Sequence, residues 1–246
     1  MKIIVNGAGG RMGTVLCNLI DAAPDKEIAA RVSAEFTTDA AKQLYQSLDE
    51  YTGDADCIID FSNHTAVPAL CAYAVRRQLP LVIATTGLTE AEMAAAADAA
   101  KTIPVFRSAN MSLGVALVAC LAKITAKAFP GADIEILEKH HNQKLDVPSG
   151  TALLLADAIK TVRPESTYNI GRHDYGKRTK EEIGIHSLRM GNEVGTHEII
   201  FSMGSQTVTL RHEAESRALF AEGALSAAAF LIGKAPGTYS MDDIFE

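Results

Sequence analysis

The residues best suited to chemistry lie in one polar segment, residues 138–151, which reads Glu-Lys-His-His-Asn-Gln-Lys-Leu-Asp-Val-Pro-Ser-Gly-Thr. Within it, Lys139, His140, His141 and Lys144 fall among six consecutive residues. Histidine is the usual general acid or base near neutral pH. Clustered cations in a chain of net charge −7 concentrate positive potential locally. The segment therefore predicts proton transfer on an anionic substrate.

The end of this segment adds groups that could hold an anion. Ser149, Gly150 and Thr151 lead into a predicted helix over residues 151–162. The first N–H groups of a helix have no partner within it, and the helix dipole favours negative charge there. These groups suit a substrate that carries carboxylates. Two simpler interpretations stay open: a solvated surface loop, and a metal site. No cysteine and few carboxylates accompany the histidines, so we expect no metal.

A second candidate site is the glycine-rich segment Gly-Ala-Gly-Gly-Arg-Met-Gly at residues 7–13, between a predicted strand and a predicted helix. Glycines there allow a tight turn and let the backbone approach a pyrophosphate, which the helix N-terminus attracts. The spacing is one residue longer than the common G-x-G-x-x-G, and a tight turn alone can require glycine. Four more strand–helix units follow. We therefore predict that this segment binds a nicotinamide dinucleotide.

The residues after the second predicted strand bear on which dinucleotide is used. A chain that binds NAD usually carries an acid there, which grips the adenosine ribose. Ser33 stands at that position, and Glu35, two residues later, could substitute for the acid. Without an acid, a 2′-phosphate meets no repulsion and could pair with Arg11 or Arg31. We expect NADPH to be used at least as well as NADH.

Composition excludes several classes of protein. The chain has 246 residues, of which 48% are apolar, so it is not intrinsically disordered. It has 23 Lys and Arg against 30 Asp and Glu, whereas binding nucleic acid requires clustered cations. Trp is absent and aromatic residues make up only 6%, which disfavours a base-stacking surface. We expect a small-molecule substrate and no nucleic-acid partner.

Cysteine usage and hydropathy indicate the compartment. Cysteines at positions 17, 57, 71 and 120 have no close pair, which favours reduced thiols over a disulfide framework or a zinc site. The first predicted strand begins at residue 2 and leaves no room for a signal peptide. The longest uncharged run, residues 108–122, is shorter than the roughly 20 residues that span a bilayer. We expect a cytoplasmic protein with no membrane partner.

The first hundred residues alternate short apolar runs with amphipathic stretches. Such alternation is typical of a parallel α/β sheet, here a Rossmann-type dinucleotide-binding domain. Thr89 and Glu92 form a capping box that opens one of the helices. The sequence predicts strands over 2–6, 27–33, 56–61, 79–85 and 103–108, and helices over 11–22, 65–77 and 89–101.

The pattern changes after residue 110. The sequence predicts a long apolar helix over 112–129, a strand over 133–138, a polar loop over 140–149, and strands over 182–190, 193–203 and 206–213. Consecutive strands that alternate at period two favour an antiparallel or mixed open sheet in an α+β domain. A final apolar helix, 216–232, is expected to pack back on the first domain. We predict a discontinuous first domain, 1–111 with 216–246, and a second domain, 112–215.

Taken in order, these motifs resemble one family, the 4-hydroxy-tetrahydrodipicolinate reductases, formerly called dihydrodipicolinate reductases, of lysine and diaminopimelate biosynthesis. The most specific motif is His-His-x-x-Lys-x-Asp-x-Pro-Ser-Gly-Thr at residues 140–151. The other matching pieces are the glycine turn, Asp60-Phe61-Ser62, Thr85-Thr86-Gly87, Ser108-Ala109-Asn110-Met111-Ser112-Leu113-Gly114, and Ser216-Arg217 with the Phe220-Ala221 and Gly223-Ala224-Leu225 pieces that follow.

The resemblance implies NAD(P)H-dependent reduction of 4-hydroxy-tetrahydrodipicolinate to tetrahydrodipicolinate with loss of water. It implies that His140 donates or accepts a proton, that Lys144 donates one, and that His141, Lys144, Gly150 and Thr151 hold the substrate's carboxylates. It also implies that the second domain binds substrate, and that the protein is a homotetramer assembled through the sheet of that domain. The cofactor contacts it implies are Gly7, Ala8, Gly9, Gly10, Arg11, Met12, Ser33, Phe61, Ala84, Thr85, Thr86, Ser108, Ala109, Asn110 and Met111.

Two departures and two alternatives accompany this interpretation. Ser33-Ala34 stands where relatives that accept both cofactors carry Glu-Arg, and the segment from 33 to 56 is short. An aspartate-like amino-acid dehydrogenase would share the glycine turn but gives no reason for the segment 138–151. A catalytically inactive nucleotide sensor would not need His140 and Lys144. The variant His140→Ala separates a catalyst from a sensor.

Overall fold

A computed structural model describes residues 1–173 and 175–245. The chain divides into two compact units. Unit 1 comprises residues 1–112 and the described residues from 218 onward, and unit 2 comprises residues 113–217. None of the helices in the described ranges combines the length and the apolar character needed to cross a membrane.

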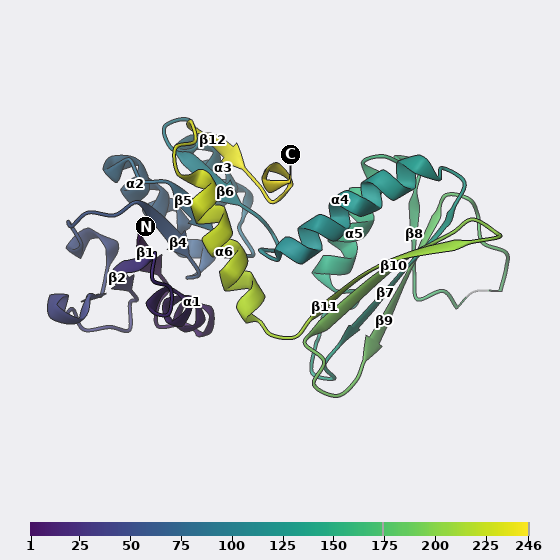
Figure 1. Cartoon of the computed structure of the whole chain (residues 1–246), viewed down its shortest axis with the longest axis horizontal. Helices are drawn as coiled ribbons and strands as arrows, with labels where there is room; N and C mark the ends of the chain where they lie inside the picture. Colours follow the sequence, from purple (N-terminus) through teal and green to yellow (C-terminus); the bar gives the residue numbers. More distant parts are fainter. Residues whose placement is uncertain (174, 246) are drawn as a thin grey trace. The chain divides into compact units, whose positions relative to one another are not determined.

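Unit 1 is built on a parallel sheet of seven strands in the order β12-β6-β5-β4-β1-β2-β3 (Figure 1). The Rossmann-type fold predicted from the sequence is confirmed. The strands are β1 (Lys2–Asn6), β2 (Glu27–Val32), β3 (Leu44–Tyr45), β4 (Cys57–Asp60), β5 (Leu81–Ile83), β6 (Pro104–Arg107) and β12 (Gly237–Tyr239). The edge strands β3 and β12 were not predicted, because two or three partly exposed residues make no apolar run.

Helices cover both faces of this sheet. The connection β1–α1–β2 runs one way along the sheet and β4–α2–β5 runs the other way. Right-handed connections then place α1 (Arg11–Asp21) and α2 (Val67–Arg77) on opposite faces. Helix α3 (Glu90–Ala99), opened by the predicted capping box, packs beside α2. Helix α6 (Ala218–Leu231) packs against α1, β4, β5 and β6, as predicted for the final helix. Short 3-10 turns lie at Ala40–Lys42, Leu48–Glu50, His64–Ala66 and Asp242–Ile244.

Unit 2 contains a mixed sheet of five strands in the order β11-β10-β7-β9-β8. Strands β7, β8 and β9 run parallel, and β10 is antiparallel to β7 and β11. The predicted mixed sheet is thus confirmed. The strands are β7 (Asp133–His140), β8 (Thr167–Ile170), β9 (Glu182–Arg189), β10 (Gly195–Ser202) and β11 (Thr207–Ala214). Strand β8 lies in a polar stretch where none was predicted, because it is a half-exposed edge strand.

Two helices, α4 (Leu113–Ala128) and α5 (Gly150–Lys160), lie against one face of the mixed sheet (Figure 1). That face is apolar along most of its length and forms the core of unit 2. Its buried strand side chains are Ile134, Ile136, Ile183, Ile185, Ile199 and Phe201. The predicted boundary of β7 was wrong: the strand continues through His140, so this histidine is a strand residue and not a loop residue.

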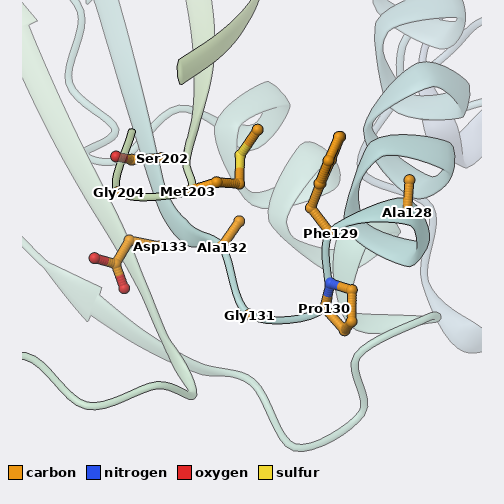
Figure 2. A pocket seen from close by; sticks show the side chains of 9 residues that line it. All are labelled: Ala128, Phe129, Pro130, Gly131, Ala132, Asp133, Ser202, Met203 and Gly204. Atoms are coloured by element: carbon orange, nitrogen blue, oxygen red, sulfur yellow. The ribbon is translucent and has the colours of Figure 1, made fainter. Parts of the chain in front are cut away.

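A cavity of about 420 Å³ lies where α4 ends and β7 begins (Figure 2). Phe129 and Met203 supply its large side chains, and Ala132, Gly131 and Pro130 line much of the rest. None of the site residues predicted from the sequence lines this cavity.

Candidate active site

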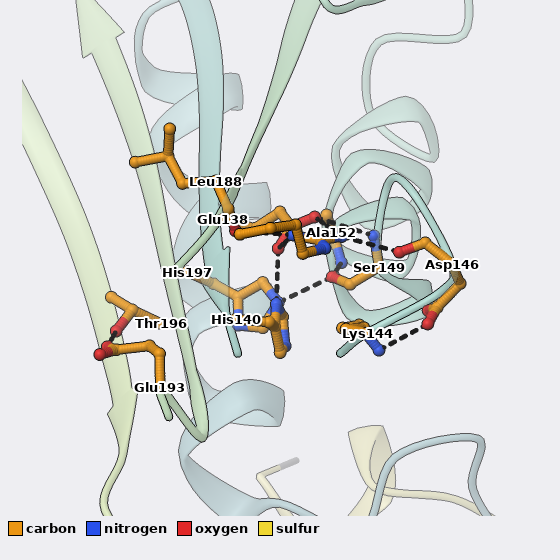
Figure 3. A network of polar contacts seen from close by, with 11 residues as sticks. Glu138, His140, Lys144, Asp146, Ser149, Ala152, Leu188, Glu193, Thr196 and His197 are labelled. Carbon is orange, nitrogen blue, oxygen red and sulfur yellow. Dashed lines mark hydrogen bonds and ion pairs between the residues drawn. The ribbon is translucent and has the colours of Figure 1, made fainter. Parts of the chain in front are cut away.

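His140 points into the interior of unit 2 because of its place on β7. Alternate residues of β7 are buried, so Ile136, Glu138 and His140 share the face that the helices cover. The Nδ1–H of His140 donates to Oε2 of Glu138 over 2.5 Å (Figure 3). In the neutral ring this bond leaves Nε2 as the atom free to exchange a proton. A Cβ at position 195 would come within 3.0 Å of Nε2, so Gly195 makes room for the ring.

Glu138 is fully buried and is held by donors from three elements. Besides His140, the guanidinium of Arg189 donates to both carboxylate oxygens, over 2.8 and 2.9 Å. The backbone N–H of Ser149 donates to Oε1 over 3.2 Å. Burial alone would raise the pKa of Glu138, but the hydrogen bonds from His140 and Arg189 outweigh burial and hold its pKa well below the usual range. Glu138 is therefore an ionised carboxylate against the His140 ring.

A second buried histidine, His197, packs against the first. His197 lies on β10, where the antiparallel register sets it opposite Glu138. The His140 and His197 rings are 5.2 Å apart between centroids, at an angle of 72°. Burial, and secondarily the nearby His140, lowers the pKa of His197 to about 3. His197 is therefore neutral at physiological pH.

Ser149 joins these histidines to the start of α5. Its Oγ lies 3.0 Å from Nε2 of His197 and accepts from the N–H of Ala152 over 3.2 Å, which caps the helix (Figure 3). Gly150 and Thr151 are the first two helical residues, so their N–H groups lie in the first turn, as predicted. The network thus brings the His140 ring and the α5 N-terminus together through Glu138 and Ser149.

The two remaining residues predicted for this site lie in the loop after β7. Nζ of Lys144 is 2.8 Å from Oδ1 of Asp146 (Figure 3). The hydrogen bond from Lys144 is the largest of the interactions that lower the pKa of Asp146. The backbone N–H of His141 donates to the carbonyl of Glu193 over 2.8 Å. Within the described ranges, no three His, Cys, Asp or Glu side chains gather as a metal site would require.

Sequence reasoning missed Glu138, Arg189 and His197. The period-two alternation of β7 was a usable signal for Glu138, since it places Glu138 and His140 on one face. Arg189 and His197 come from β9 and β10, and their proximity depends on strand register, which the sequence alone does not reveal.

The glycine turn of unit 1 is formed by close backbone packing. Gly7 has φ +82°, and a Cβ there would lie 2.6 Å from the carbonyl carbon of Phe61. A Cβ on Gly13 would lie 2.1 Å from the Gly7 carbonyl oxygen. By contrast, a Cβ on Gly10 would come only within 3.3 Å of that same oxygen. Gly7 and Gly13 are therefore required by the turn itself, while the turn leaves more room for a side chain at Gly10.

A cavity of about 610 Å³ lies at the carboxyl ends of β1, β2 and β4. Open α/β sheets bind ligands at this edge. Among the predicted cofactor contacts, Gly7, Gly10, Ser33 and Phe61 line it. The other predicted contacts lie outside this lining, in the glycine turn and directly after β5 and β6 at the same edge of the sheet: Ala8, Gly9, Arg11, Met12, Ala84, Thr85, Thr86, Ser108, Ala109, Asn110 and Met111. The glycine cradle and the cavity fit a dinucleotide.

A buried carboxylate ties the strand ends at this edge together. Asp60 accepts from Nδ2 of Asn6 over 2.7 Å, from Oγ of Ser62 over 2.6 Å and from Oγ1 of Thr85 over 2.7 Å. Burial raises the pKa of Asp60, and these hydrogen bonds oppose the rise. The network fixes the ends of β1, β4 and β5 relative to one another, and with them Phe61 and Thr85.

The three charged residues that bear on binding of a 2′-phosphate, Arg31, Arg11 and Glu35, differ in their exposure and in their partners. Arg31 forms an ion pair with Asp21 at 2.7 Å and donates to Gln43, so its charge is already matched. Arg11 is exposed at the start of α1. Glu35 is exposed and lines the cavity beside Ser33. Arg31 is thus already paired in this structure, whereas Arg11 is exposed.

Family models cover almost the whole chain. The model of the dihydrodipicolinate reductase N-terminus matches residues 1–111, and the model of its C-terminus matches residues 114–245. The chain belongs to the dihydrodipicolinate reductase family. Members of this family, also named 4-hydroxy-tetrahydrodipicolinate reductases, catalyse the NAD(P)H-dependent reduction step of lysine and diaminopimelate biosynthesis. The chain is an oxidoreductase of this type, and the dehydrogenase and sensor alternatives are set aside.

Individual relatives of this reductase family agree over their full lengths. The 4-hydroxy-tetrahydrodipicolinate reductase of Caldanaerobacter subterraneus subsp. tengcongensis is 47% identical, covering 99% of this chain and 98% of the relative. That of Clostridium tetani is 42% identical, covering 98% and 96%. A dipicolinate-bound dihydrodipicolinate reductase from Paenisporosarcina sp. TG-14 superposes with a TM-score of 0.85 at 24% identity, covering 99% of each chain, and shares the fold.

Proposed function

We propose that this reductase converts 4-hydroxy-tetrahydrodipicolinate to tetrahydrodipicolinate with loss of water, with His140 as the proton donor. Loss of water gives a conjugated ring, to which one hydride and one proton must then be added. NAD(P)H supplies the hydride when bound. The observation that carries the proposal is the bond from His140 Nδ1–H to Glu138, because it commits Nε2 to the exchange of a proton.

The remaining residues of the segment 138–151 hold the substrate in this proposal. A cyclic dicarboxylate presents two anions, and a relative of the same fold is described as dipicolinate-bound. Gly150 and Thr151 offer N–H groups at the start of α5, and His141 and Lys144 add cationic or donor side chains. Lys144 exchanges its pairing with Asp146 for a substrate carboxylate, and serves as a second proton donor. Orientation of the bound ring supplies the entropic part of the rate.

Unit 1 binds the cofactor in this proposal, and unit 2 binds the substrate. NADPH is used at least as well as NADH. Ser33, which is not an acid, lines the cavity at the end of β2, and Arg11, within the glycine-rich segment, is exposed. Glu35 lines the same cavity and acts in the opposite sense, so the balance between the two cofactors depends on these side chains.

The proposed assembly is a homotetramer in the cytoplasm, formed through the mixed sheet of unit 2. The face of this sheet that α4 and α5 do not cover carries Leu137, Leu188 and Ile200. Leu188 is 42% exposed in the single chain. Association of such faces would remove this apolar surface from water.

The test is oxidation of NADPH and NADH by the purified protein, with substrate made in the same cuvette from pyruvate and aspartate semialdehyde by the preceding synthase. We expect turnover, and we expect His140→Gln to lose about 100-fold or more in kcat while its affinity for NADPH is unchanged. His173→Gln, which alters an exposed histidine outside the site, is the matched control. Folded protein that oxidises neither cofactor would overturn the proposal.

A further inference from the structure

Both carboxylate oxygens of Glu138 have two hydrogen-bond partners each. His140 Nδ1–H and one Arg189 nitrogen share Oε2, while the Ser149 N–H and the other Arg189 nitrogen share Oε1. The side chain is 0% exposed, so water does not compete for these bonds. The Arg189 nitrogens and the Ser149 N–H can only donate, and the lowered pKa of Glu138 keeps its carboxylate ionised, so Nδ1 of His140 donates as well. The site is therefore built to keep a full negative charge against the Nδ1 side of His140.

Arg189 is placed to keep that carboxylate both charged and fixed. It stands beside His140 in the parallel register of β7 and β9, and its two terminal nitrogens grip both oxygens of Glu138. One of these nitrogens also donates to the carbonyl of Asp146 over 2.7 Å. Asp146 belongs to the loop that carries Lys144. Arg189 thus links the carboxylate behind His140 to the loop that bears the second proposed proton donor.

We propose that Glu138 and Arg189 form a positioning pair for the reaction. Glu138 sets the tautomer and orientation of His140 and offsets the charge of its protonated ring. Arg189 fixes the position of Glu138 relative to the loop at residue 146. Neither residue touches substrate in this proposal; both act through His140. The inference rests on the proposed role of His140.

The effect of the isosteric change Glu138→Gln can be derived from the hydrogen-bond partners of this side chain. A carboxamide has one accepting oxygen, so its NH2 group must face donors on one side. The side of His140 is the less costly, because an imidazole Nδ1 can become an acceptor by moving the ring proton to Nε2. The variant then holds the opposite neutral tautomer and lacks the counter-charge for the protonated ring. A similar loss of a carboxylate behind a catalytic histidine lowers turnover by several orders of magnitude.

We expect Glu138→Gln to lower kcat by about 100-fold and to change the KM for NADPH by less than about twofold. The charged and titratable groups around the His140 ring include Glu138 on β7, Arg189 on β9 and His197 on β10, with the Lys144–Asp146 ion pair in the loop. Removing the negative charge that bonds the ring disfavours its protonated form. The alkaline limb of the kcat profile should therefore move to lower pH.

Glu182→Gln is the matched control, since Glu182 is also a buried glutamate of unit 2 paired with an arginine, Arg172, at 3.2 Å. It stands at the other end of β9 from Arg189, and we expect its kcat and pH profile to match the wild type. Arg189→Met should lose as much kcat as Glu138→Gln. The double variant should lose little more than either single variant, because the two residues act as one unit.

A wild-type pH profile and kcat within about threefold of wild type for folded Glu138→Gln would overturn the inference. Additive losses in the double variant would also overturn it. Should the variants not fold, nitrogen-15 NMR of the wild-type histidines decides: a neutral His140 with its proton on Nδ1 supports the pair, and one with its proton on Nε2 overturns it. The proposed function fails separately, if His140→Gln itself keeps full turnover.

Discussion

Nε2 of His197 lies 3.0 Å from Oγ of Ser149, and both side chains are buried beside the His140 ring. Ser149 also caps α5, so one hydroxyl connects the neutral histidine of β10 to the helix whose first N–H groups face the substrate in our proposal. A charged His197 would have to lose its hydration in this place without a carboxylate partner of its own. The burial of His197 therefore predicts that the folded chain loses stability as the pH is lowered.

We predict that the free energy of unfolding decreases as the pH is lowered from 7 to 5, because of His197. Its pKa is lowered to about 3 in the folded chain, against roughly 6.5 when unfolded. In this window the unfolded chain binds a proton that the folded chain does not, so stability rises with pH. The loss from His197 should reach about 2 kcal/mol at pH 5, before Glu138, with its lowered pKa, begins to contribute near pH 4.

Urea unfolding of His197→Gln at several pH values tests this. The variant should be less stable than wild type at pH 7, and the gap should narrow as the pH falls, because the variant has no imidazole at this position to protonate in the unfolded state. His173→Gln, at an exposed position, should run parallel to wild type. A gap between His197→Gln and wild type that stays constant across this range would contradict the prediction.

The glycine turn separates a requirement of the fold from a requirement of the cofactor. Gly13→Ala places a methyl group 2.1 Å from the Gly7 carbonyl oxygen, so we expect a loss of about 2 kcal/mol or more in stability. Gly10→Ala meets that oxygen only at 3.3 Å, so the fold should tolerate it. Because Gly10 lines the cavity, its methyl group should block close approach of a pyrophosphate and weaken NADPH binding about tenfold.

Thermal melts and isothermal titration with NADPH measure both effects. Gly131→Ala, where a Cβ would meet nothing within 4 Å, controls for the change of glycine to alanine itself. Unchanged NADPH affinity in Gly10→Ala would show that the cofactor does not approach this part of the turn.

The sequence predicted the elements that bury long apolar runs and missed those that do not. Ile3, Ile4 and Val5 are all fully buried, and their strand was predicted within its observed bounds. Strand β3 offers only two half-buried residues and is defined by its pairing with β2. Edge strands of this kind exist through their neighbours, so local sequence carries little sign of them.

Of the candidate site, some residues were identified from the sequence and others were missed. His140 and Lys144 were identified because their types and spacing within one segment suggest proton transfer. Arg189 and His197 stand 49 and 57 positions beyond His140, and each reaches the site through the register of a different strand. Register follows from the packing of the whole sheet. The proposed proton donor could therefore be named from the sequence, and the groups that hold it could not.

Glu35 is predicted to limit the preference for NADPH. Its carboxylate lines the cavity beside Ser33, where it repels a 2′-phosphate and can accept from the ribose hydroxyls of NADH. Glu35→Gln should raise the ratio of kcat/KM for NADPH over NADH by about fivefold. Glu27→Gln, at the exposed start of β2, should leave the ratio unchanged. An unchanged ratio in Glu35→Gln would show that this side chain does not reach the ribose.

The proposed tetramer is predicted to depend on the uncovered face of the mixed sheet in unit 2. Leu188 is exposed on the face of the mixed sheet that the helices leave uncovered, and its neighbour across the parallel register is Lys139. Leu188→Lys would set a second cation beside the first and remove apolar area from the proposed contact, so we expect the proposed tetramer to dissociate into smaller species. Sedimentation velocity measures this, with Met93→Lys on α3 of unit 1, at similar exposure, as the matched control. Wild-type protein that sediments as a monomer would refute the homotetramer. A tetramer that persists in Leu188→Lys but dissociates in Met93→Lys would move the contact to unit 1.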